Sequence, residues 1–250
     1  MSPRRRRLTR RSAVALAGGA AALALWLGGP TLLRRLAWFR VRQLELLGVK
    51  RLAPDAVIAA LRLPPRVSVF TDTRLLADRV RGLTGVAEAR VVRRLPAALQ
   101  IEVREVEPAA LAPPGSRGGG GGGGGALVAV DAEGRALPFD PARTGLDLPI
   151  AASADRRVAA VLALVQAVDP ALFQTITSAR GLARGDVLLE LGPRRVLLRR
   201  DAGPEVIRAV ALVARDLAAK RRPYVELDAR FAGQVVVRRK ASAGLAGGGA

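Results

Sequence analysis

A run of 22 residues without a charged side chain, Ser12 to Leu33, limits what the rest of this chain can be. As a helix with a rise of about 1.5 Å per residue, the run would be roughly 33 Å long, enough to cross a hydrocarbon core of about 30 Å. Cleavable signal peptides usually have an apolar core of only about 7 to 15 residues. We therefore predict a transmembrane helix over residues 12–33. The alternatives are a buried core helix and a twin-arginine export signal at residues 9–12.

The charges around this run predict its orientation. Residues 1–11 contain six arginines and no acid, and basic segments next to a membrane span tend to stay in the cytoplasm. The preference is reduced by Arg34 and Arg35, which follow the span. We expect a single-pass protein of the plasma (inner) membrane, with the basic tail inside and the C-terminal bulk of the chain outside.

Composition excludes several chemistries. The chain has no cysteine and no histidine, which rules out disulfides, Ser-His-Asp and Cys-His catalysis, and zinc sites with those ligands. The net charge of +20 is spread along the chain, and only 3% of residues are aromatic, so nucleic-acid binding is a weaker interpretation than proximity to anionic lipid or another acidic polymer. We expect no cofactor, no metal and no small-molecule substrate.

Carboxylates that could act together in catalysis form three sequence pairs. The pairs are Asp131 with Glu133, Asp186 with Glu190, and Glu226 with Asp228. Acids are common at turns for backbone reasons, and the other pairs fall at strand edges. We expect all of them on solvated faces, so the chain is not predicted to be an enzyme.

Apolar periodicity after the span predicts a small α+β domain over residues 34–112. A strand ends at Gly48, a helix starts at Pro54, a second helix is capped by Asp72, and strands follow over 86–93 and 99–105. The order is strand, helix, helix, strand, strand. Both helices must then bury their apolar stripes on one face of a three-stranded sheet.

The last part of this domain carries a spaced pattern that resembles the POTRA domain of the FtsQ/DivIB family of bacterial division proteins. The pattern consists of Val86, Ala89, Val91, Arg93, Pro96, Leu99, Ile101, Val103, Glu105, Pro108 and Ala110. Within it, Arg93 and Glu105 are candidates to face each other across the hairpin. The resemblance implies a short cytoplasmic tail, one span, a POTRA domain and a β-rich domain. POTRA domains also occur in envelope assembly and protein export systems, which is the alternative function.

A glycine-rich segment, residues 113–125, should be a disordered loop, because glycine loses the most backbone entropy on ordering. It is not followed by the Gly-Lys-Ser/Thr of a phosphate-binding loop. Residues 126–240 then alternate turns with short apolar runs and two amphipathic helices. They predict a second domain of antiparallel strands with two helices, and residues 241–250 should be disordered.

The end of this second domain resembles the closing motif of the same family. Asp228, Arg230, Phe231 and Gly233 match an aspartate, an arginine, an aromatic and a glycine turn that precede a last strand. The resemblance implies that the last strand is a sheet edge that receives a segment of FtsB, which is itself paired with FtsL.

On this hypothesis the edge backbone is that of Val235, Val236 and Val237, and the partner adds a strand to it. Arg230 would offer a bidentate partner to an acidic residue, and Phe231 an apolar contact. The alternative is that Phe231 is a core residue and Arg230 a solvated charge. The sequence thus predicts a non-catalytic, membrane-anchored scaffold of the division septum with FtsB and FtsL-like partners.

Overall fold

The structure is a computed structural model that describes residues 37–114 and 126–239. Its contacts divide the chain after Glu105 into two compact units. The predicted first domain ended at residue 112, but the strand Ala110–Ala112 belongs to the sheet of the second unit. The predicted tail and membrane span (1–33), the glycine run (115–125) and the C-terminal segment (241–250) lie outside the described residues. Within the described ranges, no helix has the length and apolarity needed to cross a bilayer.

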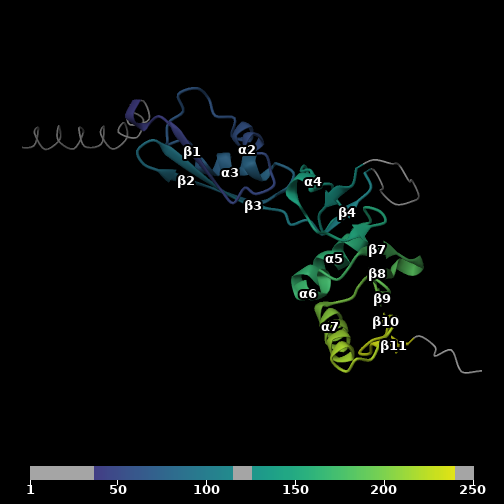
Figure 1. Cartoon of the computed structure of the whole chain (residues 1–250). Coiled ribbons are helices and arrows are strands. Elements are labelled where there is room, and N and C mark those ends of the chain that lie inside the picture. Colours follow the sequence, from purple (N-terminus) through teal and green to yellow (C-terminus); the bar gives the residue numbers. More distant parts are fainter. Residues whose placement is uncertain (1–36, 115–125, 240–250) are drawn as a thin grey trace, which may run out of the picture. The chain divides into compact units, whose positions relative to one another are not determined.

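The first unit has the predicted order of strand, helix, helix, strand, strand (Figure 1). Its elements are η1 (Ala37–Phe39), β1 (Gln43–Leu47), α2 (Pro54–Leu61), α3 (Thr73–Arg81), β2 (Val86–Arg94) and β3 (Ala98–Glu105). The sheet order is β1-β3-β2, with β1 parallel and β2 antiparallel to β3. The parallel pair is possible because α2 and α3 carry the chain across one face of the sheet.

The local signals for the helices of this unit are those read from the sequence. Pro54 occupies the first turn of α2, and the Asp72 carboxylate caps α3 by accepting hydrogen bonds from the Arg74 and Leu75 N–H groups. The apolar stripes of both helices meet alternate residues of the strands. Their shared core consists of Leu52, Val57, Leu61, Val69, Leu76, Ala77, Val80, Val86, Val91, Leu99, Ile101 and Val103.

The candidate pairing of Arg93 with Glu105 is wrong. The hairpin register pairs Arg93 with Leu99 and Glu105 with Val86, so the two side chains lie at opposite ends of the hairpin. Arg93 instead donates hydrogen bonds to the carbonyl oxygens of Val69 and Thr71.

Glu105 anchors the segment between β1 and α2. Its buried carboxylate accepts hydrogen bonds from the N–H groups of Lys50 (2.8 Å), Arg51 (2.9 Å) and Leu52 (2.9 Å). Burial alone would raise the pKa of this carboxyl, but the three backbone hydrogen bonds outweigh it and lower the pKa. Glu105 is therefore a structural residue of the first unit.

The second unit contains one eight-stranded sheet in the order β11-β10-β9-β8-β7-β6-β4-β5. The strands are β4 (Ala110–Ala112), β5 (Val128–Val130), β6 (Ile150–Ala151), β7 (Ser178–Gly181), β8 (Val187–Leu191), β9 (Arg194–Leu198), β10 (Glu226–Asp228) and β11 (Val236–Arg238). The helices are α4 (Pro141–Thr144), α5 (Arg156–Val168), α6 (Pro170–Phe173) and α7 (Pro204–Ala219), with a 3-10 turn, η2 (Ala183–Gly185).

Two features of this unit correct the sequence prediction. The sheet is mixed rather than antiparallel, because β4 and β6, β6 and β7, and β9 and β10 run parallel. The two expected helices are α5 and α7, and the described residues add the short α4 and α6. Parallel neighbours need a crossover, and here α5 connects β6 to β7 and α7 connects β9 to β10.

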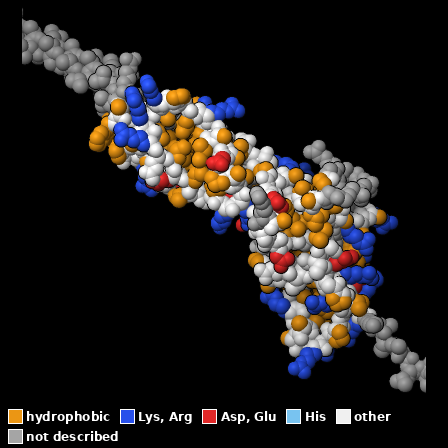
Figure 2. Space-filling view, turned by 45° about the horizontal axis from the view of Figure 1, so that its top comes forward, with side chains coloured by type: hydrophobic (Ala, Val, Ile, Leu, Met, Phe, Trp, Pro, Cys, Tyr) orange, Lys and Arg blue, Asp and Glu red, His pale blue; other side chains and the backbone are white. Residues whose placement is uncertain are grey.

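The core of the second unit lies between one face of the sheet and the helices α5 and α7 (Figure 1). Val196, Leu198 and Leu227 from the sheet pack in the same cluster as Leu162 of α5 and Ile207 of α7. Lys and Arg side chains are spread over both units in the view of Figure 2, as the even distribution of charge along the sequence predicts. The opposite face of the sheet is free of α5 and α7, and it carries the polar residues described next.

Candidate functional site

The last strand of the second unit, β11, is an edge of the sheet. It pairs with β10 on one side, and no strand of the described residues lies on its other side. Val235 and Val237 are half-buried against the core, whereas Val236 points to the other face and is 40% exposed. Of the three valines predicted to form the edge, Val236 and Val237 lie in β11, whereas Val235 immediately precedes the strand; their side chains alternate between the two faces.

Within the described residues, the backbone of β11 has groups on its outer side that no strand pairs with. The carbonyl oxygen of Arg238 accepts a hydrogen bond from the Val225 N–H at 2.9 Å, so the backbone of Arg238 faces β10. Backbone groups of successive residues in a strand point to alternate sides. The N–H and C=O of Val237 consequently point away from the sheet, where another strand could pair with them.

A row of polar side chains runs from β7 to this edge, on the face opposite α5 and α7. After its first member, a serine, the residues alternate between negative and positive charge. The register places Ser178, Glu190, Arg195, Glu226 and Arg238 side by side on β7, β8, β9, β10 and β11. We call these five residues the charge ladder. The ladder ends at Arg238, on the outermost strand.

The inner members of the charge ladder are held by short contacts. The Ser178 hydroxyl donates to Glu190 at 2.6 Å, and the Glu226 carboxylate, 3% exposed, lies 2.6 Å from Arg195 and 3.2 Å from Arg238. The Glu226 Oε1 that faces Arg238 accepts no hydrogen bond within the described residues, so its contact with Arg238 is purely electrostatic. Arg238 is thus held at the edge by charge while its side chain stays 61% exposed.

The neighbouring row on the same face is mostly apolar between β8 and β11. Leu188, Leu197, Asp228 and Val236 lie side by side on β8 to β11, and Leu188 is buried. Its one charged member, Asp228, is 1% exposed. Beside the edge, an incoming strand would therefore meet an arginine in one row and a valine in the next.

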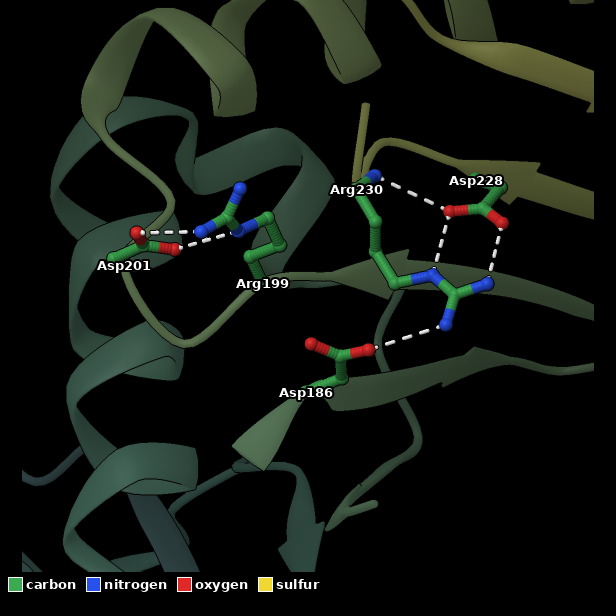
Figure 3. Close-up of polar contacts among 5 residues, drawn as sticks. All are labelled: Asp186, Arg199, Asp201, Asp228 and Arg230. Carbon is green, nitrogen blue, oxygen red and sulfur yellow. Dashed lines mark hydrogen bonds and ion pairs between the residues drawn. The ribbon is translucent and has the colours of Figure 1, made fainter. Parts of the chain in front are cut away.

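Arg230, expected to bind an acidic residue of a partner, is already engaged inside the chain (Figure 3). Its guanidinium donates to both carboxylate oxygens of Asp228, at 2.8 and 2.7 Å, and to Asp186 at 3.1 Å. The hydrogen bonds from Arg230 lower the pKa of Asp228, although burial opposes them, and the two carboxylates raise the pKa of Arg230. Because both arms of its fork are filled, Arg230 fixes the turn after β10 and is not a free partner.

Phe231 and Gly233 lie in the turn between β10 and β11. Phe231 is 55% exposed, so its side chain is not a core residue, and it borders a groove that also contains Arg199 and Asp201. Gly233 has φ +71, a conformation that L residues avoid, and the Phe231 carbonyl accepts a hydrogen bond from the Gln234 N–H. Exposed Phe231 thus lies in the turn that leads to the edge strand.

Three of the six carboxylates expected on solvated faces are buried, which corrects the prediction for them, whereas Glu133 is exposed as expected and Asp186 and Glu190 are half-buried. Asp131, Glu226 and Asp228 are all at most 3% exposed. Each is paired with an arginine, namely Arg135, Arg195 and Arg230 respectively. Among the described residues, no three acidic side chains gather in a way that could hold a metal ion. These carboxylates stabilise turns and strands through arginine pairs.

Sequence reasoning missed Arg238 as a site residue and considered Glu226 only as a catalytic carboxylate. Their side chains meet because β10 and β11 pair in one register, and β10 joins β9 only through the long crossover of α7. The alternation of charge at 190, 195, 226 and 238 would have been the only signal, and it has no fixed spacing in the chain.

Residues 39–105 match the model of the POTRA domain, FtsQ-type. The match covers the whole β1-α2-α3-β2-β3 arrangement, which makes the first unit a POTRA domain. The chain is also 35% identical over 162 residues to the cell division protein FtsQ of Anaeromyxobacter sp. (strain K). The similarity covers 61% of this chain and 50% of the relative, so the chain spans about half the length of the curated relative that it matches.

The domain match and the FtsQ relative support a relationship of the chain to the FtsQ/DivIB family: residues 39–105 are a POTRA domain of the FtsQ type, and the chain is similar to FtsQ over part of its length. The domain match agrees with the resemblance that the spaced motif of residues 86–110 indicated. From here we call the first unit the POTRA domain and the second the β domain.

Proposed function

We propose that the chain is a membrane-anchored, non-catalytic scaffold of the bacterial divisome. Its relative is a cell division protein, and its POTRA domain is of the FtsQ type. In this proposal residues 12–33 anchor the chain in the plasma (inner) membrane, with the N-terminus in the cytoplasm. The POTRA and β domains then lie outside the cytoplasm at the septum and bind FtsB and FtsL-like proteins.

The open edge of β11 is the observation that carries this proposal. Sheet edges with unpaired N–H and C=O groups are normally blocked, because they recruit strands from other chains. Among the described residues no strand covers the outward backbone of Val237, and Phe231, in the turn that leads to β11, is exposed. Recruitment by strand addition fits a protein whose role is assembly and not chemistry.

The two rows beside the edge define the chemistry of the segment that would bind. The charge ladder alternates in sign and ends on a positive side chain, so the next position outward favours a carboxylate beside Arg238. The neighbouring row favours an apolar residue beside Val236. We therefore expect the partner strand to carry an acidic and an apolar residue at alternate positions on this face.

Removing the positive charge at the end of the charge ladder should weaken binding of the partner strand. Arg238→Gln is expected to raise the dissociation constant for the extracytoplasmic segment of the FtsB-like protein by about fivefold, the equivalent of a cross-strand charge pair of about 1 kcal/mol. Isothermal titration calorimetry at low salt measures the change. Arg230→Glu is unsuitable, because it would leave the buried Asp228 beside a second carboxylate.

Arg195→Gln is the matched control for this experiment. Arg195 contacts the same carboxylate, Glu226, but lies two strands inside the edge. Its replacement should leave the affinity unchanged. Equal losses for both variants would show that the ladder acts only through the stability of the sheet, and an unchanged affinity for Arg238→Gln would remove Arg238 from the interface.

A further inference from the structure

We propose that one end of the POTRA domain docks on the anionic phospholipid headgroups of the membrane in which the chain is anchored. The proposal rests on the predicted span at residues 12–33 but not on any divisome partner. The residues of this basal surface are Trp38, Arg40, Arg42, Arg66, Arg94 and Leu95.

The fold brings the basal surface together from three separate segments. β1 and β3 run parallel and start at this end of the domain, and β2 ends there. The Arg42 N–H donates to the Ala97 carbonyl oxygen at 2.8 Å, which holds the start of β1 against the β2-β3 turn. Arg40 forms an antiparallel bridge with Ser68, so the turn before Ser68, which contains Arg66, lies at the same end.

Two large apolar side chains protrude from this surface. Trp38 is 67% exposed and Leu95, in the β2-β3 turn, is 64% exposed. Phe39, the residue after Trp38, packs on Phe70 with ring centroids 5.1 Å apart, which fixes η1 on the domain and keeps Trp38 on the outside. Tryptophan is the residue most typical of the interface between membrane and water, because its ring is apolar and its N–H is polar.

The positive charges of the basal surface are not neutralised by the domain. Within residues 37–114 and 126–239, none of Arg40, Arg42, Arg66 and Arg94 forms an ion pair, and Arg94 donates only to the neutral Gln100 amide. At the other end of the same sheet, Arg104 pairs with Glu88. Where the described chain begins, basic and hydrophobic side chains lie next to one another (Figure 2). This mixture is complementary to anionic headgroups over an apolar interior.

Chain length places this end of the domain at the membrane. Only residues 34–36 separate the predicted span from Ala37 of η1, and three residues reach at most about 10 Å when fully extended. The basal surface therefore starts within reach of the headgroup layer. Contact with lipid costs little additional ordering, because the anchor already holds the domain there.

Fluorescence of Trp38 in the full-length chain tests the proposal. Trp26→Phe leaves Trp38 as the single tryptophan. The chain is reconstituted in nanodiscs of phosphatidylcholine, with or without phosphatidylglycerol, and with lipids brominated near the headgroup as quenchers. We expect Trp38 to be quenched in discs that contain phosphatidylglycerol and quenched less in phosphatidylcholine alone.

Removal of three exposed positive charges should release the basal surface from the lipid headgroups. Arg42→Gln, Arg66→Gln and Arg94→Gln together should shift the balance between docked and undocked domain on the order of 100-fold, about fivefold for each arginine. Quenching should then fall to the level in phosphatidylcholine alone. Arg81→Gln, Arg90→Gln and Arg104→Gln make the same change in charge on the same domain away from the basal surface, and they should leave quenching intact.

Four results would overturn the proposal. The first is an unquenched Trp38 in both lipids, and the second is equal quenching with and without phosphatidylglycerol. The third is an equal loss of Trp38 quenching in the two triple variants, which would mean that only the total charge of the domain matters. Failure of the chain to insert into nanodiscs would remove the anchor on which the proposal depends, and with it the proposal. Binding of the FtsB-like segment to β11 is measured independently, so its failure would leave this result standing.

Discussion

Replacing Val237 with proline should abolish binding of the FtsB-like segment, with an affinity loss of at least about 100-fold. The Val237 N–H points away from the sheet, so proline removes a donor that only an added strand would use. The ring also obstructs the close approach of a partner backbone, which affects more than one of the hydrogen bonds to the new strand. The dissociation constant from calorimetry measures the loss.

Val237→Ala separates this effect from the loss of side-chain packing. Val237 is half-buried against the core, so both variants lose valine contacts, but only proline lacks the N–H. We expect alanine to retain most of the affinity. If alanine and proline weaken binding equally, or if proline binds as wild type does, the partner does not pair with the outward backbone of β11.

Replacing Glu105 with alanine should destabilise the POTRA domain by about 3 kcal/mol. The substitution leaves the N–H groups of Lys50, Arg51 and Leu52 without their acceptor, and hydrogen bonds to a charged group are individually worth about 1.5 to 3 kcal/mol. The expected loss of unfolding free energy is smaller than the sum of three such hydrogen bonds, because water reaches part of this segment. Urea unfolding in the Trp26→Phe background, followed by Trp38 fluorescence, reports on this domain, since η1 packs on it through Phe39.

The pH dependence of stability is a second test of the stabilising role of the Glu105 carboxylate. Its pKa is lowered in the folded state, so its stabilisation is complete above the unfolded value of about 4.3 and is lost as pH falls through the lower folded value. Wild type should therefore lose stability on acidification below about pH 4. Glu105→Gln cannot titrate at this position, so its free energy of unfolding should fall less steeply below about pH 4. The same fall in both proteins would mean that the carboxylate is not held as described.

The POTRA domain could be predicted from the sequence because its signals are local. Pro54 and Asp72 mark helix starts by backbone chemistry, and Leu99, Ile101 and Val103 alternate on a strand that is buried on one face. These features act within a few residues of each other. Strand order and helix placement then follow from the need to bury two apolar stripes on one sheet.

The β domain and the candidate site were less predictable because their decisive contacts join distant residues. Arg230 was expected to face a partner, but Asp186, 44 positions earlier, and Asp228 fill its guanidinium fork. The parallel pairing of β9 with β10 depends on how α7 packs, which periodicity does not reveal. The charged rows at the edge become visible only once this register is known, and so Arg238 could not be recognised from the chain alone.

Amide hydrogen exchange at β11 tests the central claim most directly. In the free chain the Val237 N–H should exchange rapidly, while the Arg238 N–H, whose residue faces β10, serves as the internal reference. With the FtsB-like segment bound to saturation, exchange at Val237 should slow by at least about 100-fold, because its N–H is then paired in a sheet. Saturated binding that leaves Val237 exchange unchanged would contradict the claim that a partner strand docks on this edge.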